Sequence, residues 1–342
     1  MTHEPPLAPR VQVIAHRGAS AHLPEHTLAA YARAIADGAD LIEPDLVMTR
    51  DGVLLARHEN EIGGTTDVAA HARCAGRRTR KWIDGEAVEG WFTEDFTLAE
   101  LKTLRARERL PALRGTAHDG EFALATLEEI IELLAAENTR HGRRVGLIPE
   151  IKHATYFQQL GLAMEQRLLG TLQAHACTRT VPVVIQSFET ANLRALRGAL
   201  AERPNVRLLQ LIDTPQAQPY DVQAAGGHIR YADLLTPAGL REVARYADAI
   251  GPPTRAVLPL DDAGAFRAAT PLVHDAHAAG LEVHVYTFRP ENVFLPRALW
   301  RGDEPATVNM HGSIAEISAH LHAGIDAFFA DDPAIGCMAR DA

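Results

Sequence analysis

Short apolar segments alternate with longer amphipathic stretches along most of the chain. The apolar segments are rich in Val, Ile and Leu, whereas the longer stretches repeat apolar residues with the 3.6-residue period of a helix. This alternation is typical of parallel α/β folds, in which a helix follows each strand. The segments that predict strands are 11–15, 40–46, 145–150, 183–187, 206–212, 248–250, 282–287 and 327–330.

The helical patterns lie between these strands, and several of them end at a glycine, as helix C-termini often do. Eight strands with intervening helices predict a (β/α)8 barrel that spans residues 10–342. Two features fit this prediction least well: the sixth strand is short, and no long helical pattern follows the eighth. The predicted helices are roughly 25–37, 126–139, 157–175, 190–202, 236–246, 266–280 and 312–324.

One connection departs from the alternation. Residues 48–58 predict a hairpin with Asp51-Gly52 at its turn. Residues 59–125 then carry scattered Gly, Arg and Trp with only weak periodicity. A structureless loop of that length is unusual in a compact domain, so we predict a small inserted subdomain. Because it follows strand two, we expect it on the C-terminal, catalytic face of the barrel.

Composition fits a globular protein and narrows its partners. Of 342 residues, 46% are hydrophobic and 23% are charged, which supplies ample material for a core. The net charge of -10 is unfavourable for a general nucleic-acid or anionic-membrane surface. The three cysteines are widely spaced and predict neither a zinc ribbon nor a disulfide framework.

The chain shows no targeting or membrane-spanning pattern. It has no run of about 18 apolar residues, the length that a transmembrane helix needs. The polar, Pro-rich start at residues 1–10 lacks the apolar centre of a signal peptide. The sequence as it stands therefore predicts a cytoplasmic protein. A periplasmic or secreted protein whose signal peptide has been removed is the alternative.

Two acids lie in the second predicted strand, and a third lies in the next strand. Glu43 and Asp45 are two positions apart, so their side chains leave the same face with Cα atoms roughly 6.5 Å apart. Two carboxylates that close repel unless a cation lies between them, and hard oxygen ligands suit Mg²⁺ or Ca²⁺. Glu150 can supply a third ligand. An isolated Glu-x-Asp pair is typical of solvated surface, but an apolar strand with a matching acid beside it favours a metal site.

Histidines and cations lie at the same predicted edge of the barrel. His16 and Arg17 directly follow the first strand, His58 ends the hairpin, and Lys152 shares the side of Glu150. Arg17 suits bidentate phosphate binding, with a surface salt bridge as the alternative, and Lys152 suits a phosphate oxygen. Two imidazoles, one accepting a proton from the nucleophile and one donating a proton to the leaving alkoxide, constitute general acid–base catalysis.

The whole set predicts a metal-dependent phosphodiesterase. A divalent cation together with the two basic side chains would neutralise the charge of a phosphoryl group. Neither a Walker loop nor a GxGxxG segment follows a strand, which argues against nucleotide-dependent transfer and dinucleotide redox chemistry.

In combination, these motifs resemble the glycerophosphodiester phosphodiesterase family, especially its larger bacterial, periplasmic-type members. The family pattern is His-Arg, then Glu-x-Asp, then His, which here is His16-Arg17, Glu43-Pro44-Asp45 and His58. Further similar segments are spread over nearly the whole chain. They are 92–106 (FTEDFTLAELKTLRA), 126–131 (TLEEII), 149–153 (PEIKH), 186–189 (QSFE), 247–252 (ADAIGP), 285–292 (VYTFRPEN) and 324–333 (GIDAFFADDP).

The resemblance implies hydrolysis of glycerophosphodiesters, such as glycerophosphocholine or glycerophosphoethanolamine, to an alcohol and sn-glycerol 3-phosphate. Larger bacterial members tend to use calcium and others magnesium, so the expected cofactor is Ca²⁺ or Mg²⁺. The residues that the resemblance implicates are Glu43, Asp45 and Glu150 as metal ligands, His16 and His58 as the catalytic pair, and Arg17 and Lys152 as phosphate contacts.

One departure from the family pattern is visible. The common Pro-Glu-Asn-Thr segment reads Pro-Glu-His-Thr at residues 24–27, so His26 replaces an amide near the expected site. We expect this change to alter pH dependence or substrate fit. Glu25 is expected either to serve the site or to pair with the N-terminal charge of the following helix.

Aromatic residues follow strands four and seven. Phe188, Tyr286 and Phe288 are expected to pack against the glycerol or alcohol part of a substrate, although aromatic residues there also cap barrel cores. The insert 59–125 is expected to cover the barrel mouth and set which alcohol is accepted, with oligomerisation or shielding as the alternative.

Two other functions compete with this hypothesis. One is a phospholipase C- or D-like barrel enzyme acting on a lipid phosphodiester, but the insert has no concentrated apolar or basic loop for a membrane. The other is a barrel that binds phosphodiesters without catalysis. The expected partner is a small-molecule glycerophosphodiester, with no nucleic acid and no stable membrane association. The oligomeric state is left open.

Overall fold

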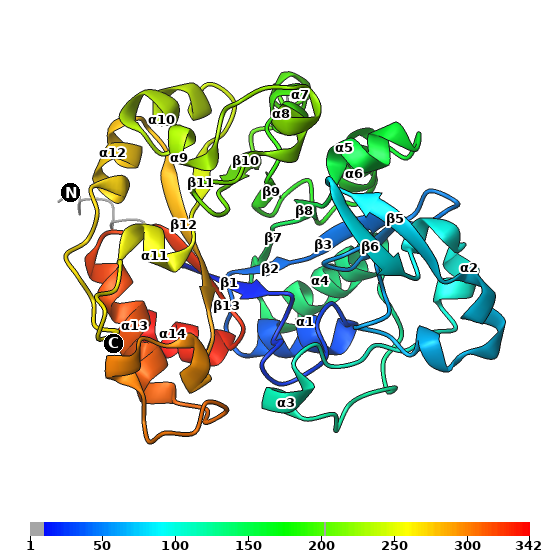
Figure 1. Cartoon of the computed structure of the whole chain (residues 1–342), viewed down its shortest axis with the longest axis horizontal. Coiled ribbons are helices and arrows are strands. Elements are labelled where there is room, and N and C mark those ends of the chain that lie inside the picture. Colours follow the sequence, from blue (N-terminus) through cyan, green and yellow to red (C-terminus); the bar gives the residue numbers. More distant parts are fainter. Residues whose placement is uncertain (1–9, 202) are drawn as a thin grey trace.

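A computed structural model describes residues 10–201 and 203–342, and Figure 1 shows strands at the centre with helices around them. Residues 1–9, most of the segment that bears on targeting, and residue 202, in the predicted helix 190–202, lie outside the described residues. Parallel pairing runs around the sheet from β10 through β13, β1 and β2 to β9, and β9 pairs with β10, which closes the barrel.

The described chain thus forms the predicted (β/α)8 barrel, with eight strand positions, two of them built from broken strands. The strands are β1 (Gln12–His16), β2 (Leu41–Glu43), β3 (Asp45–Met48), β7 (Gly146–Leu147), β8 (Glu150–Ile151), β9 (Val183–Ser187), β10 (Val206–Leu211), β11 (Ala249–Gly251), β12 (Glu282–Phe288) and β13 (Ala327–Ala330), and β4 (Leu54–Ala56) pairs antiparallel with β3 as the predicted hairpin.

Prolines account for both breaks. The second strand, predicted as continuous over 40–46, is interrupted at Pro44, and the third, predicted over 145–150, is interrupted at 148–149, which includes Pro149. Proline has no N–H to donate to a sheet ladder, so the ladder is interrupted at each proline. The strands resume at Asp45 and at Glu150. The breaks lie beside the acids at 43, 45 and 150, and they place these acids at the barrel mouth.

Capping residues mark the start of several outer helices. In α4, Thr126 and Glu129 form a reciprocal capping box, and Gly142 ends the helix in the left-handed conformation. The outer helices are α1 (Leu28–Ala36), α4 (Leu127–His141), α5 (Ala154–Gln159), α6 (Glu165–Ala174), α7 (Ala191–Ala199), α8 (Tyr220–Ala224), α9 (Tyr231–Leu234), α10 (Pro237–Val243), α11 (Thr254–Val257), α12 (Leu272–Ala278), α13 (Met310–His322) and α14 (Pro333–Asp341).

Three helix predictions were wrong. The helix expected over 157–175 is divided into α5 and α6 by a turn at Gly161, whose φ of 74° favours glycine. The helix expected over 266–280 covers only α12. A helix, α14, does follow the last strand: Asp332 caps it and Pro333 occupies its first turn, which is a helix start signal.

Two apolar layers hold the barrel together. The inner layer fills the barrel with side chains from successive strands, including Ile14, Leu41, Leu209 and Phe329. The outer layer lies between strands and helices. Because both faces are covered, strand residues are buried almost continuously, which is why the strands are apolar runs and not alternating patterns.

Residues 59–125 leave the barrel after the β3–β4 hairpin and return before α4. They contain η1 (Val68–Ala70), η2 (Ala72–Arg77), the antiparallel pair β5 (Thr79–Ile83) and β6 (Glu86–Gly90), η3 (Thr93–Asp95), α2 (Leu98–Leu101) and α3 (Pro111–Arg114). Buried side chains of this insert, such as Phe92 and Phe96, belong to the same core as the outer barrel layer.

Candidate active site

Strand register brings the predicted acids and one histidine to the same end of the barrel. His16 lies beside Glu43 in the β1–β2 pair, and Asp45 lies beside Glu150 in the β3–β8 pair. Gln186 follows beside Glu150 on β9. Since the carboxyl ends of parallel barrel strands share one face, these side chains gather where barrel enzymes carry their active sites.

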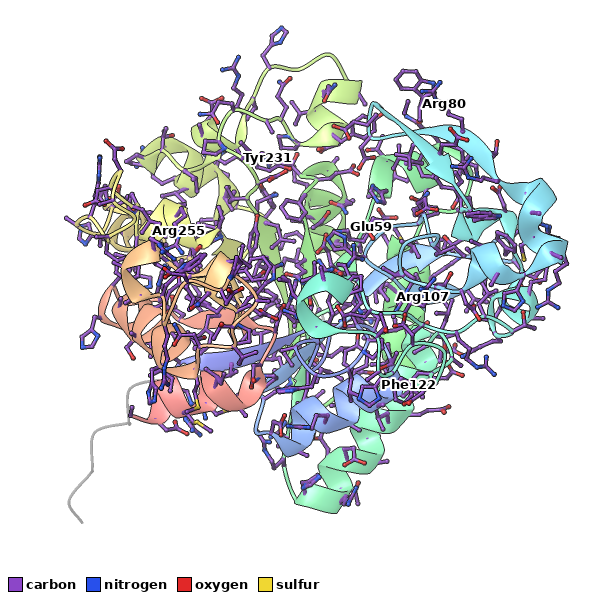
Figure 2. All side chains as sticks on the ribbon, turned by 60° about the horizontal axis from the view of Figure 1, so that its bottom comes forward. Glu59, Arg80, Arg107, Phe122, Tyr231 and Arg255 are labelled. Carbon is purple, nitrogen blue, oxygen red and sulfur yellow. The ribbon has the colours of Figure 1, made fainter. Side chains whose placement is uncertain are left out.

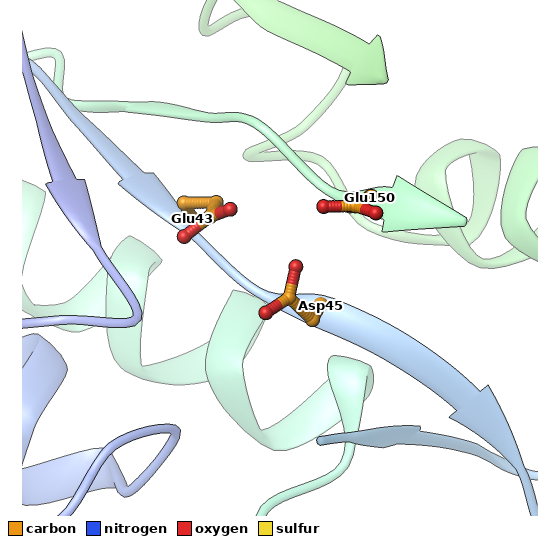
Figure 3. A group of neighbouring side chains, drawn as sticks. All are labelled: Glu43, Asp45 and Glu150. Atoms are coloured by element: carbon orange, nitrogen blue, oxygen red, sulfur yellow. The ribbon is translucent and has the colours of Figure 1, made fainter. Parts of the chain in front are cut away.

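The three acids form a buried trio. Glu43, Asp45 and Glu150 each offer one carboxylate oxygen, and these atoms lie within 4.8 Å of one another (Figure 3). All three residues are at least nine-tenths buried. Glu43 Oε2 accepts a hydrogen bond of 2.9 Å from the Arg17 backbone N–H, and Glu43 Oε1 accepts one of 3.1 Å from the Gln186 amide.

Burial and mutual repulsion oppose the ionisation of the three carboxylates. Burial and the charge of Asp45 raise the pKa of Glu43 well above its ordinary value. Burial also raises the pKa of Glu150 to about 8, although Lys152 opposes this shift. Burial disfavours the ionised form of Asp45 too, but Lys152 and Arg17 hold the pKa of Asp45 well below its usual range. Three carboxylates this close ionise together only when more positive charge is present.

The donor set fits a divalent cation. Asp45 Oδ1 is buried and has no hydrogen-bond partner among the described residues. A buried oxygen without a donor is costly unless a ligand satisfies it. The trio supplies only carboxylate oxygens, which are the ligands that Mg²⁺ and Ca²⁺ prefer.

The two predicted basic residues contact this trio. Arg17 Nε lies 3.2 Å from Asp45 Oδ2, and Arg17 Nη1 donates to Glu25 Oε2 at 3.0 Å. Lys152 Nζ lies 2.8 Å from Glu150 Oε1. Arg17 adopts a left-handed φ of 61° and precedes Gly18, where a Cβ would lie 2.7 Å from the Ala30 carbonyl carbon. This tight turn directs the Arg17 backbone N–H at Glu43.

Each predicted histidine has a carboxylate behind it. His16 Nδ1 lies 2.6 Å from Asp331 Oδ1, and His58 Nδ1 lies 2.5 Å from Glu59 Oε1. Burial and the charge of Arg17 lower the pKa of His16 to about 4. Burial together with Arg17 and Lys152 lowers the pKa of His58 to about 3. With Nδ1 engaged, Nε2 is the remaining ring nitrogen for proton transfer at each histidine.

Two cavities meet at this cluster. One, of about 460 Å³, is lined by both histidines, Arg17, Glu43 and Glu150. The other, of about 630 Å³, is lined by His58, Glu150 and Lys152 together with residues of the insert. Both share Phe188 and Tyr286, two of the three aromatic residues predicted to face substrate.

Phe288 does not join them, so that expectation was wrong. It is 2% exposed and packs edge-on against Phe328 and His320. Strand β12 alternates its side chains, and the two-residue step from 286 to 288 contains an irregularity in the pairing with β13. The register shift turns Phe288 into the outer core.

His26, the departure from the family pattern, is fully buried and has a left-handed φ of 59°. Histidine and asparagine are both enriched in this conformation, which accounts for the exchange. His26 Nε2 lies 3.0 Å from Asp45 Oδ2, and Nδ1 lies 2.7 Å from the Tyr31 hydroxyl. Glu25 pairs with Arg17 at 3.0 Å and with Arg109 at 2.6 Å, so its ion-pair partners lie beside the candidate site.

Several residues of the cluster were missed from the sequence. Asp331 and Glu59 contact the histidines, and Gln186 contacts Glu43. A signal was present for each: Asp331 directly follows the last strand, Glu59 directly follows His58, and Gln186 lies in a segment similar to the family. Arg109 and Arg114 of the insert carried no such signal. Arg109 binds Glu59, and Arg114 binds Asp331.

Comparison with known proteins shows to which family this chain belongs. The description "Glycerophosphoryl diester phosphodiesterase family" matches residues 16–335, which include all the candidate site residues. The chain belongs to this family. The phosphodiesterase is 34% identical over 307 residues to a glycerophosphodiester phosphodiesterase of Arabidopsis thaliana, a match that covers 86% of this chain and 78% of the relative. It is 30% identical to one of Haemophilus influenzae, with 82% and 79% covered.

Solved structures agree with the fold. The phosphodiesterase superposes with a TM-score of 0.66 on a putative glycerophosphoryl diester phosphodiesterase from Silicibacter pomeroyi, at 22% identity over 97% of this chain and 94% of that one. An Oleispira antarctica phosphodiesterase, solved in complex with the product sn-glycerol-3-phosphate, gives a TM-score of 0.61 at 20% identity, with 97% and 98% covered. The family match and the curated relatives show that the protein is an enzyme, a phosphoric diester hydrolase, and the solved structures agree with its barrel fold.

Proposed function

We propose that this phosphodiesterase hydrolyses glycerophosphodiesters, glycerophosphocholine and glycerophosphoethanolamine among them, to an alcohol and sn-glycerol 3-phosphate. The observation that carries the proposal is the convergence of three buried carboxylates, two carboxylate-backed histidines and two basic side chains on adjoining cavities. The relative from Oleispira antarctica, with sn-glycerol-3-phosphate bound, supports the same product here.

Glu43, Asp45 and Glu150 are proposed to hold a divalent cation, Ca²⁺ or Mg²⁺. Their oxygen-only donor set and the unpartnered Asp45 Oδ1 support this assignment. When bound, the cation would supply positive charge against the phosphoryl oxygens. Arg17 and Lys152 are proposed to bind the same phosphoryl group, because each already lies within 3.2 Å of a trio carboxylate.

His16 and His58 are proposed to divide the acid–base work. Their lowered pKa values make both neutral at neutral pH, so each carries one N–H and one free nitrogen lone pair. At each ring the N–H at Nδ1 faces the carboxylate, so Nε2 carries the lone pair. One histidine accepts the proton of the attacking water at Nε2, and the other, protonated at Nε2 by solvent beforehand, passes that proton to the leaving alkoxide oxygen. The bond between phosphorus and that oxygen breaks, and the released alcohol carries the proton away.

The insert 59–125 is proposed to contact the alcohol. Ile83, Asp84, Glu86 and Val88 of the β5–β6 hairpin line the larger cavity, which also reaches His58. Carboxylates and the aromatic rings of Phe188, Tyr220, Tyr231 and Tyr286 suit an ammonium group such as that of choline or ethanolamine. The glycerol phosphate end, which all these substrates share, would then occupy the cavity beside His16 and Arg17.

Product analysis tests the proposal. Incubation with glycerophosphocholine is expected to release choline and sn-glycerol 3-phosphate in equal amounts, with far slower turnover of phosphatidylcholine in vesicles. Release of phosphocholine, or preference for the vesicle lipid, would point to a phospholipase-like reaction. Absence of turnover on a panel of glycerophosphodiesters, with Ca²⁺ and Mg²⁺ both supplied, would refute the proposed function.

A further inference from the structure

Two arginines of the insert lie directly behind the histidine–carboxylate pairs. Arg109 binds Glu59 through two contacts, from Nη1 to Oε1 at 2.9 Å and from Nη2 to Oε2 at 2.7 Å. Arg114 Nη2 lies 2.6 Å from Asp331 Oδ2, while the other oxygen of Asp331 faces His16. The two chains of contacts therefore have the same order: histidine, carboxylate, arginine.

The same arginines have second anchors in the barrel. Arg109 holds Glu25 through Nε and Nη2 at 2.7 and 2.6 Å, and Glu25 in turn holds Arg17. Arg114 Nε donates to Glu291 Oε1 at 2.6 Å, and its Nη1 donates to the Ser20 carbonyl at 2.8 Å. Each guanidinium thus uses its planar fork to fix a carboxylate in one orientation.

The local fold of the insert places both arginines beside the barrel. Leu110 and Pro111 begin the short helix α3, and the chain turns so that Arg109 and Arg114 both face the barrel mouth. A narrow gap between this segment and the barrel is lined by His16, Arg17 and both arginines. Among the described residues, Arg109 and Arg114 are the arginines of the insert whose side chains bind Glu59 or Asp331.

We propose that Arg109 and Arg114 are positioning residues for the two histidines, so that the insert is part of the acid–base apparatus as well as a wall of the substrate cavity. This inference rests on the proposed function. A carboxylate behind a catalytic imidazole must keep one oxygen on Nδ1 to fix the ring and its tautomer. Asp331 is 3% exposed and Glu59 is 37% exposed at the side chain, and each has an arginine to hold its second oxygen.

The competing explanation is that the arginines only fasten the insert to the barrel. In that case their loss would lower stability, and substrate affinity with it, without depending on the histidines. The positioning role makes a different demand: the loss should fall on kcat, and it should vanish once the histidine that the arginine serves has been removed.

The experiment is a double-mutant cycle with a matched control. Arg109→Gln removes the fork, whereas Arg107→Gln removes an equal charge from the same segment, where Arg107 is half exposed and binds Asp119 within the insert (Figure 2). Each variant is made in the wild type and in His58→Ala, and kcat and KM for glycerophosphocholine are measured. Arg114→Gln with His16→Ala forms the second cycle, and thermal unfolding of every variant is recorded.

Arg109→Gln is expected to lower kcat by about 10–100-fold with KM changed less than about threefold, as for other groups that orient an active-site ligand. In His58→Ala the same substitution should cost less than about threefold, and Arg107→Gln should be silent in both backgrounds. Equal losses with and without His58, or Arg109→Gln behaving like Arg107→Gln, would overturn the inference. A wild type without turnover would instead refute the proposed function. If Arg114→Gln fails to fold, the Arg109 cycle decides.

Discussion

At the scale of single residues, His16 and His58 each have a carboxylate at Nδ1, but the two carboxylates differ in burial. His16 is backed by Asp331, which contacts with Arg289 and Arg114 keep ionised although burial opposes it, whereas the carboxylate behind His58 is more exposed. Burial lowers the pKa of both rings, so neither is held as a permanent cation. Because the N–H at Nδ1 faces the backing carboxylate, the neutral imidazole offers a lone pair at Nε2 as a base, and it acts as an acid only after Nε2 has taken up a proton.

Replacing each histidine in turn separates these roles. His16→Ala and His58→Ala are each expected to lower kcat for glycerophosphocholine by about 10²–10⁴-fold, the usual effect of losing a positioned proton carrier. For a p-nitrophenyl diester, whose leaving group needs no proton, the acid variant should lose much less. Steady-state kinetics on both substrates measure this difference. Equal losses on both substrates in both variants would contradict the division of roles.

Glu189 provides a residue-level test of stability. It is 5% exposed, accepts hydrogen bonds from Thr155, and has a pKa that burial raises to about 7. Since the unfolded carboxyl has a pKa of about 4.3, the folded state binds more protons between these values, so stability falls as pH rises through this window. Glu189→Gln is expected to flatten that fall and to be about 1–3 kcal/mol more stable than wild type near pH 8.

Urea unfolding at pH 5 and pH 8 measures the effect. The two proteins should differ little at pH 5, where Glu189 is protonated in the folded state. Identical pH dependence in wild type and Glu189→Gln would show that this carboxyl is ionised without cost, and would contradict the expected sign.

Site residues at the ends of apolar strands could be predicted from the sequence, whereas their long-range partners could not. Glu43, Asp45 and His16 are recognisable because polar groups at the ends of apolar strands have few structural reasons to be there. The pairing of His16 with Asp331 joins positions 315 residues apart, which only barrel closure brings together. Arg109 lies in a segment without periodicity, so no local pattern relates it to Glu59.

At the scale of elements, the β5–β6 hairpin gives the insert a face on the substrate cavity. Glu86 and Val88 line the cavity, and Glu89 lies on the alternate face, where it pairs with Arg78. This alternation follows from the two-residue period of a strand. Strand β6 therefore carries two glutamates on opposite faces, and only Glu86 lines the cavity proposed to hold the alcohol.

Glu86→Lys is therefore expected to disfavour cationic alcohols selectively. The kcat/KM for glycerophosphocholine relative to glycerophosphoglycerol should fall by about 3–10-fold, because a like charge replaces an opposite one near the ammonium group in a partly solvated cavity. Glu89→Lys changes the net charge equally and should leave the ratio within about twofold. Parallel shifts in both variants would mean that general charge, not this face of the hairpin, is responsible.

Element boundaries were predictable where capping residues and apolar runs agree, as in α4 and β9. They failed where a single residue overrides the pattern. Pro44 divides a stretch that was predicted as one strand, and Gly161 divides a stretch that was predicted as one helix. In the insert, short turns pack onto the barrel core without a period of their own.

At the scale of the whole molecule, barrel topology explains why a site built from residues 16 to 331 is predictable at all. Every parallel strand ends at the same face, so residues that follow strands meet whatever their separation in sequence. The alternation of strands and helices therefore predicted both the fold and the face. It did not predict the partners that reach that face from the insert. Within the described residues, no helix is both long and apolar enough to cross a bilayer.

The proposed reaction depends on a divalent cation at Glu43, Asp45 and Glu150. Asp45→Asn keeps the shape of the side chain but removes a charge from the trio, and Asp45 is the acid whose Oδ1 lacks a partner among the described residues. The barrel core is untouched by this change, so the variant should fold. Its effect should appear in the dependence of turnover on metal.

The most direct measurement is a metal-activation curve for sn-glycerol 3-phosphate release from glycerophosphocholine, recorded on chelated wild type and chelated Asp45→Asn with Ca²⁺ and with Mg²⁺. We expect the chelated wild type to be inactive and to regain activity saturably as metal is added. Asp45→Asn should require at least about tenfold more metal, equivalent to about 1.4 kcal/mol of binding free energy, or should not regain activity. Full activity of the chelated wild type, or superimposable curves for the two proteins, would contradict the proposed metal site.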